Sequence, residues 1–255
     1  MPGGVIITGA SSGIGAALAA HYAATGATLG LVARRADALS ALAGRLATTT
    51  TAYAVDVADH AAMRDAAADF IARHGVPGIV IANAGVSAGT LGAEPDDLPV
   101  LERILRTNVV GLAATLAPFV APMRERGGGI LAGIASVAGF RGVPGSGAYS
   151  GSKAAAIAWL ESLRIELAGS GVAVVTVCPG FIDTPMTRVN RYRMPFLLAA
   201  DEAARRIARA IEARRSFVVV PWQMALVGRA MRLLPNALFD AFAARAGRKP
   251  RGLPL

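Results

Sequence analysis

The chain has 255 residues, of which 54% are hydrophobic and 5% aromatic, and it has a single cysteine, Cys178. This length and composition exclude a disordered or fibrous chain and allow one large domain with a full core. One cysteine cannot form an internal disulfide, and residues 1–15 lack the basic segment that opens a signal peptide, so we expect a cytoplasmic protein. No apolar run reaches the ~20 residues of a membrane-spanning helix.

The net charge of +9 lies in the last fifth of the chain. Residues 1–204 carry equal numbers of basic and acidic side chains, whereas residues 205–255 carry eleven basic groups against Glu212 and Asp240. Such asymmetry is typical of a solvated basic tail, or of attraction to anionic lipid, nucleic acid or an acidic substrate. Because no nucleic-acid-binding motif or interleaved aromatic pattern accompanies it, we expect no nucleic-acid partner.

Short apolar runs alternate with longer Ala- and Leu-rich stretches of helical period. Predicted strands lie at residues 4–8, 28–33, 51–55, 78–83, 129–136, 172–178 and 217–221. Predicted helices lie near residues 13–25, 36–47, 60–73, 99–118, 147–168 and 201–214. Parallel strands need crossover connections and are buried on both faces. The alternation therefore predicts an α/β fold, a doubly wound parallel sheet of seven strands with helices on both faces.

Two regions depart from this alternation. Residues 180–200 form a long insertion after a strand and are expected to be a lid or binding loop. Residues 222–255 are expected to form a basic, amphipathic helical extension beyond a single domain at 1–221. It is predicted as two short helices broken at Pro235, with Asn236 as a possible cap. We expect this extension to pack on the core or on another subunit, with contact to an anionic membrane surface as the alternative.

The first strand runs into a glycine-rich turn, "TGASSGIG" at residues 8–15, that opens the first helix. Gly9, Gly13 and Gly15 would let backbone amides and the helix N-terminus approach a pyrophosphate without obstruction by a Cβ atom. Taken alone, such a turn is also compatible with a simple tight connection between a strand and a helix.

The second strand ends in "LVARR", where an acidic residue would bind the ribose 2′-hydroxyl of NAD. Ala33 and Arg34 stand there instead, and an arginine can pair with a 2′-phosphate. We therefore expect NADP(H) in preference to NAD(H), with Arg34 as the better candidate of the pair Arg34 and Arg35. The alternative is that both arginines are solvated loop residues.

Tyr149 and Lys153 are four residues apart on a predicted helix, so their side chains share a face. A phenol has an ordinary pKa of ~10, and a neighbouring ammonium favours the phenolate. Ser136 ends the preceding strand, where its hydroxyl could hold a carbonyl or alcohol oxygen while Tyr149 gives or takes the proton. This arrangement predicts proton transfer to or from an oxygen.

These motifs, in this order over residues 4–221, resemble the short-chain dehydrogenase/reductase family, single-domain oxidoreductases with a Rossmann-like fold. The resemblance implies a catalytic set of Asn108, Ser136, Tyr149 and Lys153. With the arginines above, the predicted cofactor contacts are Gly9, Ser11, Ser12, Gly13, Ile14, Gly15, Arg34, Arg35, Asp56, Val57, Asn83, Ala84, Gly85, Tyr149, Lys153, Pro179, Gly180, Ile182 and Thr184. No metal is expected, since His21, His60 and His74 share no ligand spacing.

The resemblance also implies the chemistry. Hydride would pass between a nicotinamide cofactor and a carbonyl or secondary alcohol, with Tyr149 exchanging the proton. Lys153 would hydrogen-bond the nicotinamide ribose and lower the pKa of Tyr149, and Asn108 would order a water in the proton relay. The family commonly forms oligomers, so a homodimer or homotetramer is expected. A non-catalytic NADP-binding regulator or scaffold with the same fold is the alternative function.

The substrate is expected to be hydrophobic. Apolar side chains follow Ser136 and occupy the lid, and we expect them to line the substrate pocket: Phe140, Val143, Met186, Val189, Tyr192, Met194, Phe196 and Leu197. Arg188, Arg191 and Arg193 could meet an anionic carrier such as coenzyme A, or could belong to a solvated basic loop.

Overall fold

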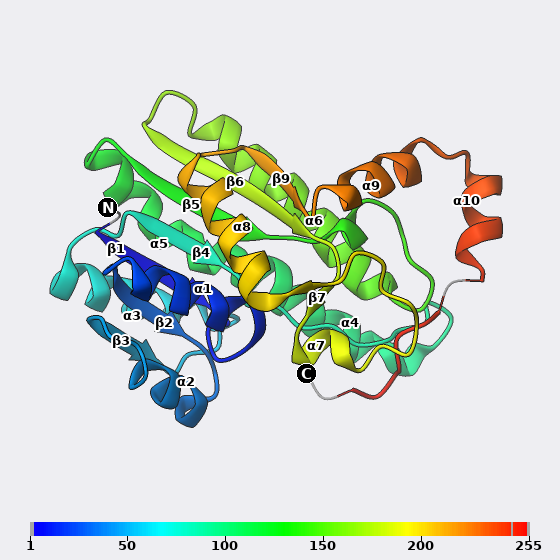
Figure 1. Cartoon of the computed structure of the whole chain (residues 1–255), viewed down its shortest axis with the longest axis horizontal. Coiled ribbons are helices and arrows are strands. Elements are labelled where there is room, and N and C mark those ends of the chain that lie inside the picture. The colour runs from blue at the N-terminus through cyan, green and yellow to red at the C-terminus, as the bar shows by residue number, and fades with distance from the viewer. Residues whose placement is uncertain (1–2, 246, 254–255) are drawn as a thin grey trace.

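Seven strands form one sheet in the order β3-β2-β1-β4-β5-β6-β9 (Figure 1). In this computed structural model, which describes residues 3–245 and 247–253, every neighbouring pair in that sheet is parallel. The strands are β1 Gly4–Thr8, β2 Thr28–Val32, β3 Thr50–Tyr53, β4 Ile79–Ala82, β5 Gly129–Ile134, β6 Val172–Pro179 and β9 Phe217–Val220. The expected doubly wound, seven-stranded parallel sheet is confirmed. Because the strand order reverses between β1 and β4, a crevice forms beyond their carboxyl ends.

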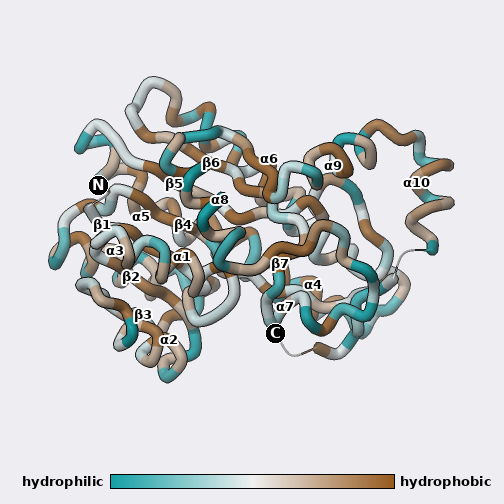
Figure 2. Tube along the Cα trace, viewed as in Figure 1, coloured by the Kyte–Doolittle hydropathy of each residue, from teal (hydrophilic) through white to brown (hydrophobic). Residues whose placement is uncertain are grey.

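Helices cover both faces of the sheet. They are α1 Gly13–Ala24, α2 Ala36–Ala43, α3 His60–His74, α4 Leu98–Leu105, α5 Gly111–Glu125, α6 Gly147–Glu166, α7 Pro185–Arg188, α8 Ala200–Glu212, α9 Gln223–Leu233 and α10 Asn236–Ala243. Side chains alternate along each strand, so Val5 and Ile7 of β1 join the core beneath α1, α2 and α8, whereas Ile6 joins the core beneath α3, α5 and α6. Most of the sheet is correspondingly brown in Figure 2.

The helix predicted at 99–118 is longer and more complex than expected. α4 and α5 are joined by a π-helical turn, Arg106–Val110, and α5 continues through Pro118 and Pro122 to Glu125. Packing explains the extension, since Leu116 and Phe119 of α5 are fully buried against the sheet. Tertiary burial here outweighs the helix-breaking tendency of proline.

The same stretch bears on the expectation that no segment could span a membrane. Pro95–Glu125 is a helical stretch of 31 residues with a hydropathy of 1.5, long and apolar enough to do so by length and composition alone. It packs, however, against β4, α3 and α6 as one layer of the fold. A core helix with one apolar face passes the same test of length and composition.

The expected lid, residues 180–200, contains regular structure. Two short strands, β7 Ile182–Asp183 and β8 Leu198–Ala199, pair in parallel at its base, and α7 follows β7 directly. The Thr187 hydroxyl donates to the Ile182 carbonyl and ties α7 back to β7. The lid is therefore anchored at both of its ends.

The C-terminal extension forms the two short helices that were expected. α9 packs on the core through Met224 and Gly228, whereas α10 has no buried residue and projects from the body in Figure 1. The assignment of Asn236 as a cap is wrong, because Pro235 is the N-cap of α10. The Asn236 side chain instead accepts a hydrogen bond of 2.7 Å from Arg141, which lies in the loop after β5.

Candidate active site

The glycine-rich turn needs its glycines for two different reasons. Gly9 and Gly13 have φ angles of +66° and +56°, which residues with a Cβ atom rarely adopt. A Cβ atom on Gly15 would lie 2.4 Å from the Gly9 carbonyl oxygen, so α1 can begin this close to the turn only with glycine there. Ser12, the N-cap of α1, makes no side-chain capping bond, which leaves the first amides of α1 available to an anion.

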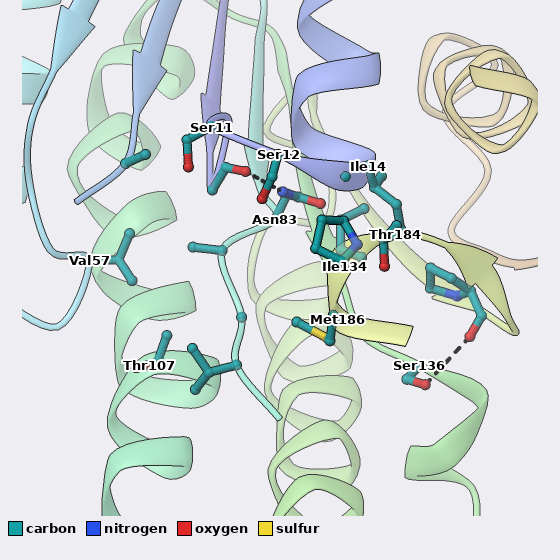
Figure 3. Close-up of a pocket in the computed structure, with 18 of the residues that line it drawn as sticks. Ser11, Ser12, Ile14, Val57, Asn83, Thr107, Ile134, Ser136, Thr184 and Met186 are labelled. Atoms are coloured by element: carbon teal, nitrogen blue, oxygen red, sulfur yellow. Dashed lines mark hydrogen bonds between the residues drawn. The ribbon is translucent and has the colours of Figure 1, made fainter. Parts of the chain in front are cut away.

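Asn83, just after β4, holds the turn in place. Its backbone amide and that of Ala84 both donate to the Thr8 hydroxyl at 3.1 Å. Its side-chain amide donates to the Thr8 carbonyl at 2.9 Å. The same amide also donates to the Gly9 carbonyl at 3.4 Å, the dashed line at Asn83 in Figure 3. The carboxyl ends of β1 and β4 are thereby fixed to each other at the crevice.

Two arginines follow β2 at the same edge of the sheet. Arg35 donates to the Ser11 hydroxyl at 3.0 Å, which links it to the glycine-rich turn. Arg34 lies 3.8 Å from the carboxylate of Asp56, which follows β3. Both guanidinium groups are exposed and positioned to meet an anionic group at this end of the crevice.

Ser136, Tyr149 and Lys153 meet at the other end. Ser136 follows β5, accepts a hydrogen bond from the Ala138 amide at 3.1 Å and donates to the Pro179 carbonyl at 3.4 Å. Burial raises the pKa of Tyr149, and a hydrogen bond with Ser136 lowers it in part. Tyr149 and Lys153 lie one turn apart on α6, as their spacing predicts.

Lys153 is almost fully buried, with 3% of its surface exposed. Its Nζ donates to the Ile134 carbonyl at 2.8 Å and lies 5.7 Å from the centre of the Tyr149 ring. Burial lowers the pKa of Lys153 to about 8. Lys153 is not among the groups that shift the pKa of Tyr149 in this structure; burial, the largest influence, raises that pKa.

Asn108 lies in the π-helical turn between α4 and α5, and turns of this kind are frequent at functional sites. Its carbonyl oxygen accepts from the Val86 amide at 2.8 Å. Its amide group donates to the Val86 carbonyl at 3.0 Å and to the Ser152 hydroxyl at 2.9 Å. Asn108 thus holds the loop after β4 against α6.

One cavity of about 320 Å³ connects the two ends of the crevice. All of the predicted cofactor and catalytic residues line it except Gly15, which packs behind the turn, and Asn108, which lies behind Gly85. The sequence interpretation missed Thr8 and Ser152, which position Asn83 and Asn108. It also missed Val86 and Thr107, which line the cavity next to predicted residues.

The arrangement fits a nicotinamide dinucleotide. Free helix amides and glycines without Cβ atoms suit a pyrophosphate at the centre. The arginines suit an adenosine ribose at one end, and the Ser136, Tyr149 and Lys153 side chains suit a reacting centre at the other. The sequence pattern of the family described as short chain dehydrogenase matches residues 4–194. The chain belongs to this family.

Relatives and solved structures agree with this membership. A protein of Myxococcus xanthus (strain DK1622), described as an uncharacterized oxidoreductase, is 39% identical over 243 residues, 94% of this chain and 96% of its own. The 2-dehydro-3-deoxy-L-rhamnonate dehydrogenase (NAD(+)) of Sphingomonas sp. (strain SKA58) is 36% identical over 181 residues, 71% of this chain and 72% of its own.

A crystal structure of a short chain dehydrogenase/reductase from Burkholderia phymatum, in complex with NAD, matches with a TM-score of 0.81. It is 25% identical, and the match covers 98% of both chains. The protein is therefore a short-chain dehydrogenase/reductase, an oxidoreductase that uses a nicotinamide cofactor and acts on CH–OH or C=O groups.

Eight apolar residues were expected around the substrate of this dehydrogenase. Of these, only Met186 lines the cavity described above. Phe140 packs instead against Gly228 of α9, and Phe196 and Leu197 are about half exposed. Tyr192 remains near the catalytic end, where it contributes to raising the pKa of Tyr149.

The other residues considered as candidates from the sequence lie outside the catalytic arrangement. Cys178 is a fully buried core residue, as expected. Within residues 3–245 and 247–253, no group of histidine, cysteine and acidic side chains could hold a metal ion. Arg188 of the lid forms a salt bridge of 2.7 Å with Asp183 at an exposed position.

Proposed function

We propose that the protein is an NADP(H)-dependent oxidoreductase that reduces the carbonyl group of a small, largely hydrophobic substrate, or oxidises the corresponding alcohol. We propose further that it works in the cytoplasm as a homodimer or homotetramer. One observation carries the chemistry: Ser136, Tyr149 and Lys153 converge at one end of a cavity whose middle is a phosphate-binding turn.

The nicotinamide, when bound, supplies or accepts the hydride. Tyr149 supplies the proton, and because burial raises its pKa, the phenol is protonated at neutral pH and ready to act as the acid in reduction. The Ser136 hydroxyl donates only a long bond, of 3.4 Å, to the Pro179 carbonyl, so it can turn to donate to a substrate oxygen. Lys153 lies beside the phenol and provides a compact ammonium for a ribose hydroxyl.

The preference for NADP(H) is proposed from the edge after β2. No carboxylate follows β2 at the position that would hold a ribose 2′-hydroxyl, whereas Arg34 and Arg35 both line the cavity there. A 2′-phosphate would pair with guanidinium groups through charge-assisted hydrogen bonds. Asp56 offsets part of the charge of Arg34, and Arg35 is held beside the turn by Ser11.

The function is tested by following NADPH consumption against a panel of ketones and aldehydes, with Tyr149→Phe and the control Tyr53→Phe. Tyr53 bonds to Asp69 away from the cavity, so its variant keeps activity. Tyr149→Phe is expected to lower kcat roughly 10²–10⁴-fold without weakening NADPH binding, because only the proton donor is lost. Undiminished turnover in Tyr149→Phe would contradict the mechanism. NADPH binding without turnover on any carbonyl would favour the regulator or scaffold.

A further inference from the structure

The chain returns to the active site after α10. Residues 247–253, here called the C-terminal strap, run beneath the lid and past α4 towards α7, drawn in red in Figure 1. The Gly89 amide, in the loop after β4, donates to the Pro250 carbonyl at 2.9 Å. The Arg248 side chain packs on Gly145 in the loop before α6. The strap therefore contacts loops that follow two strands of the sheet.

Two close contacts show that the strap packs tightly against the rest of the protein. A Cβ atom on Gly89 would lie 2.2 Å from the Lys249 carbonyl oxygen. A Cβ atom on Gly247 would lie 2.4 Å from the Cβ of Tyr192, in the lid. Only glycine fits at either position, so the strap is in direct contact both with the loop after β4 and with the lid.

An ion pair anchors the far end of the strap. The Arg251 guanidinium donates to the Asp97 carboxylate at 3.0 Å and lies 3.8 Å from Glu94. Asp97 also accepts from the Leu91 amide at 2.8 Å, and these two partners hold the pKa of Asp97 below its ordinary value. Asp97 is largely buried, so this pair is better shielded from solvent than a surface salt bridge.

Between these contacts the strap buries Lys249, one of the two lysines of the chain. Lys249 is 8% exposed, and its Nζ donates to the Ser87 hydroxyl at 3.1 Å and to the Met186 carbonyl at 3.0 Å. Both acceptors are neutral, and no carboxylate among the described residues forms an ion pair with Lys249.

An ammonium has three N–H groups, so one donor of Lys249 has no protein acceptor in the described part of the chain. A buried charge without a counter-ion is costly, and in proteins such charges are usually paired. Burial lowers the pKa of Lys249 to about 8, which leaves it mostly protonated at neutral pH. The site thus has a positive charge and a donor that a ligand anion could satisfy.

The position of this ammonium is at the border of the active-site cavity. Met186, whose carbonyl accepts from Lys249, lines the cavity together with Ser136 and Tyr149. Ser87 directly follows Val86, which also lines it. Tyr192, against which Gly247 packs, is close enough to Tyr149 to influence its pKa.

We propose that Lys249 binds an anionic group of the substrate, a carboxylate, sulfonate or phosphate, so that the natural substrate is a negatively charged carbonyl or alcohol compound. This inference rests on the proposed function and specifies its substrate. It adds a charged recognition element to a pocket that the sequence predicted to be hydrophobic, with the strap as the part of the chain that delivers it.

The test compares oxo acids with their methyl esters, which share the reacting carbonyl but differ in charge. The wild-type protein is expected to favour the acids in kcat/KM. Lys249→Met keeps the length of the side chain and should raise KM for the acids roughly 10–100-fold, as expected for loss of a hydrogen bond to a charged group. The kcat of this variant, and its kcat/KM for the esters, should stay within about threefold of the wild-type values, because the variant loses only the binding of the charged group.

Three further variants separate charge from folding. Lys249→Arg should retain part of the preference for acids. Arg248→Met removes a neighbouring, exposed charge of the strap, has an aliphatic side chain that can still pack on Gly145, and should leave the preference for acids unchanged. Gly89→Ala keeps Lys249 but displaces the strap, and should lose the preference for acids as Lys249→Met does. Melting temperature and NADPH affinity, measured for each variant, show whether the fold and cofactor site are intact.

Equal losses on acids and esters, or weaker NADPH binding in Lys249→Met, would overturn the proposal, since Lys249 would then serve the fold or the cofactor. If the wild-type protein reduces no carbonyl, the proposed function fails first. Binding then still tests Lys249: calorimetric titration of the NADP-loaded protein should detect hexanesulfonate but not hexanol, with the sulfonate lost in Lys249→Met. Equal sulfonate binding by both proteins would overturn the assignment.

Discussion

The side-chain amide of Asn108 donates to the hydroxyl of Ser152 at 2.9 Å, and this bond joins the π-helical turn to α6 beside the reacting centre. Ser152 in turn donates to the Tyr149 carbonyl at 2.7 Å. Both Asn108 and Ser152 are buried, so the position of the backbone that carries Tyr149 is linked to Asn108 through one serine.

Ser152→Ala is expected to lower both stability and turnover. It leaves one N–H of the buried Asn108 amide without an acceptor, which costs about 1–3 kcal/mol of unfolding free energy. We expect kcat to fall on the order of tenfold, because Asn108 and Tyr149 lose a shared support. Denaturant unfolding and steady-state kinetics measure the two effects. Ser162→Ala, on the exposed side of the same helix, is the control, and equal behaviour of the two variants would refute the role of Ser152.

Cofactor preference is expected to depend on the arginines after β2. Replacing Arg34 and Arg35 together by methionine should weaken NADPH binding roughly 10–100-fold, because charge-assisted bonds to the 2′-phosphate are lost. NADH lacks this phosphate, so its affinity should change less than about threefold. Fluorescence titration with both cofactors gives the ratio, and the exposed Arg45→Met serves as control. An unchanged ratio in the double variant would show that the 2′-phosphate is held elsewhere.

Lys153 makes the stability of the protein depend on pH above neutrality. Its pKa is about 8 in the folded state and ~10.4 when unfolded, so between these values the unfolded chain binds more protons and stability rises with pH. Lys153→Met removes this dependence. Between pH 7.5 and 9.5, the unfolding free energy of the wild-type protein should rise by about 1–2 kcal/mol more than that of the variant. Parallel curves for the two proteins would mean that Lys153 titrates normally.

The glycine-rich turn gives a test of packing. Gly15→Ala places a Cβ atom against the Gly9 backbone, which cannot yield as a flexible side chain would, so we expect a loss of more than about 2 kcal/mol and weaker cofactor binding. Gly151→Ala, at an exposed helical position with no neighbour within 4 Å, should instead stabilise the fold by roughly 0.5–1 kcal/mol. Thermal unfolding of both variants decides between local packing and a general effect of adding a methyl group.

Most of the active site could be predicted because its residues occupy short, ordered patterns. Tyr149 and Lys153 share a helical face by spacing alone, and the glycines of the first turn are required by backbone geometry that only glycine satisfies. The ends of parallel strands lie at one edge of a sheet, so residues such as Asn83 and Ser136, far apart in the chain, were expected at the same crevice.

The rest depended on packing that no local pattern reveals. Phe140 has the position in the chain that a pocket residue would have, but Gly228 of α9 provides a closer apolar surface for it. Lys249 looked like one charge in a basic tail, because its contacts with Ser87 and Met186 span long separations in the chain. The pKa of Tyr149 is set mainly by its burial, which spacing cannot give.

The π-helical turn also restricts the length of the chain around Asn108. Each residue of an α-helix advances the helix by about 100°, so an uninterrupted α-helix would turn Ile104 and Leu112 about 80° apart. The wider turn of residues 106–110 accommodates one additional residue, so that both of these buried side chains lie on the same side of the helix. Deleting one residue there would give a regular α-helix in which Ile104 and Leu112 stay on the same side, but the wide turn that carries the buried Asn108 would be lost. The additional residue therefore serves the position of Asn108 rather than the packing of α4 and α5.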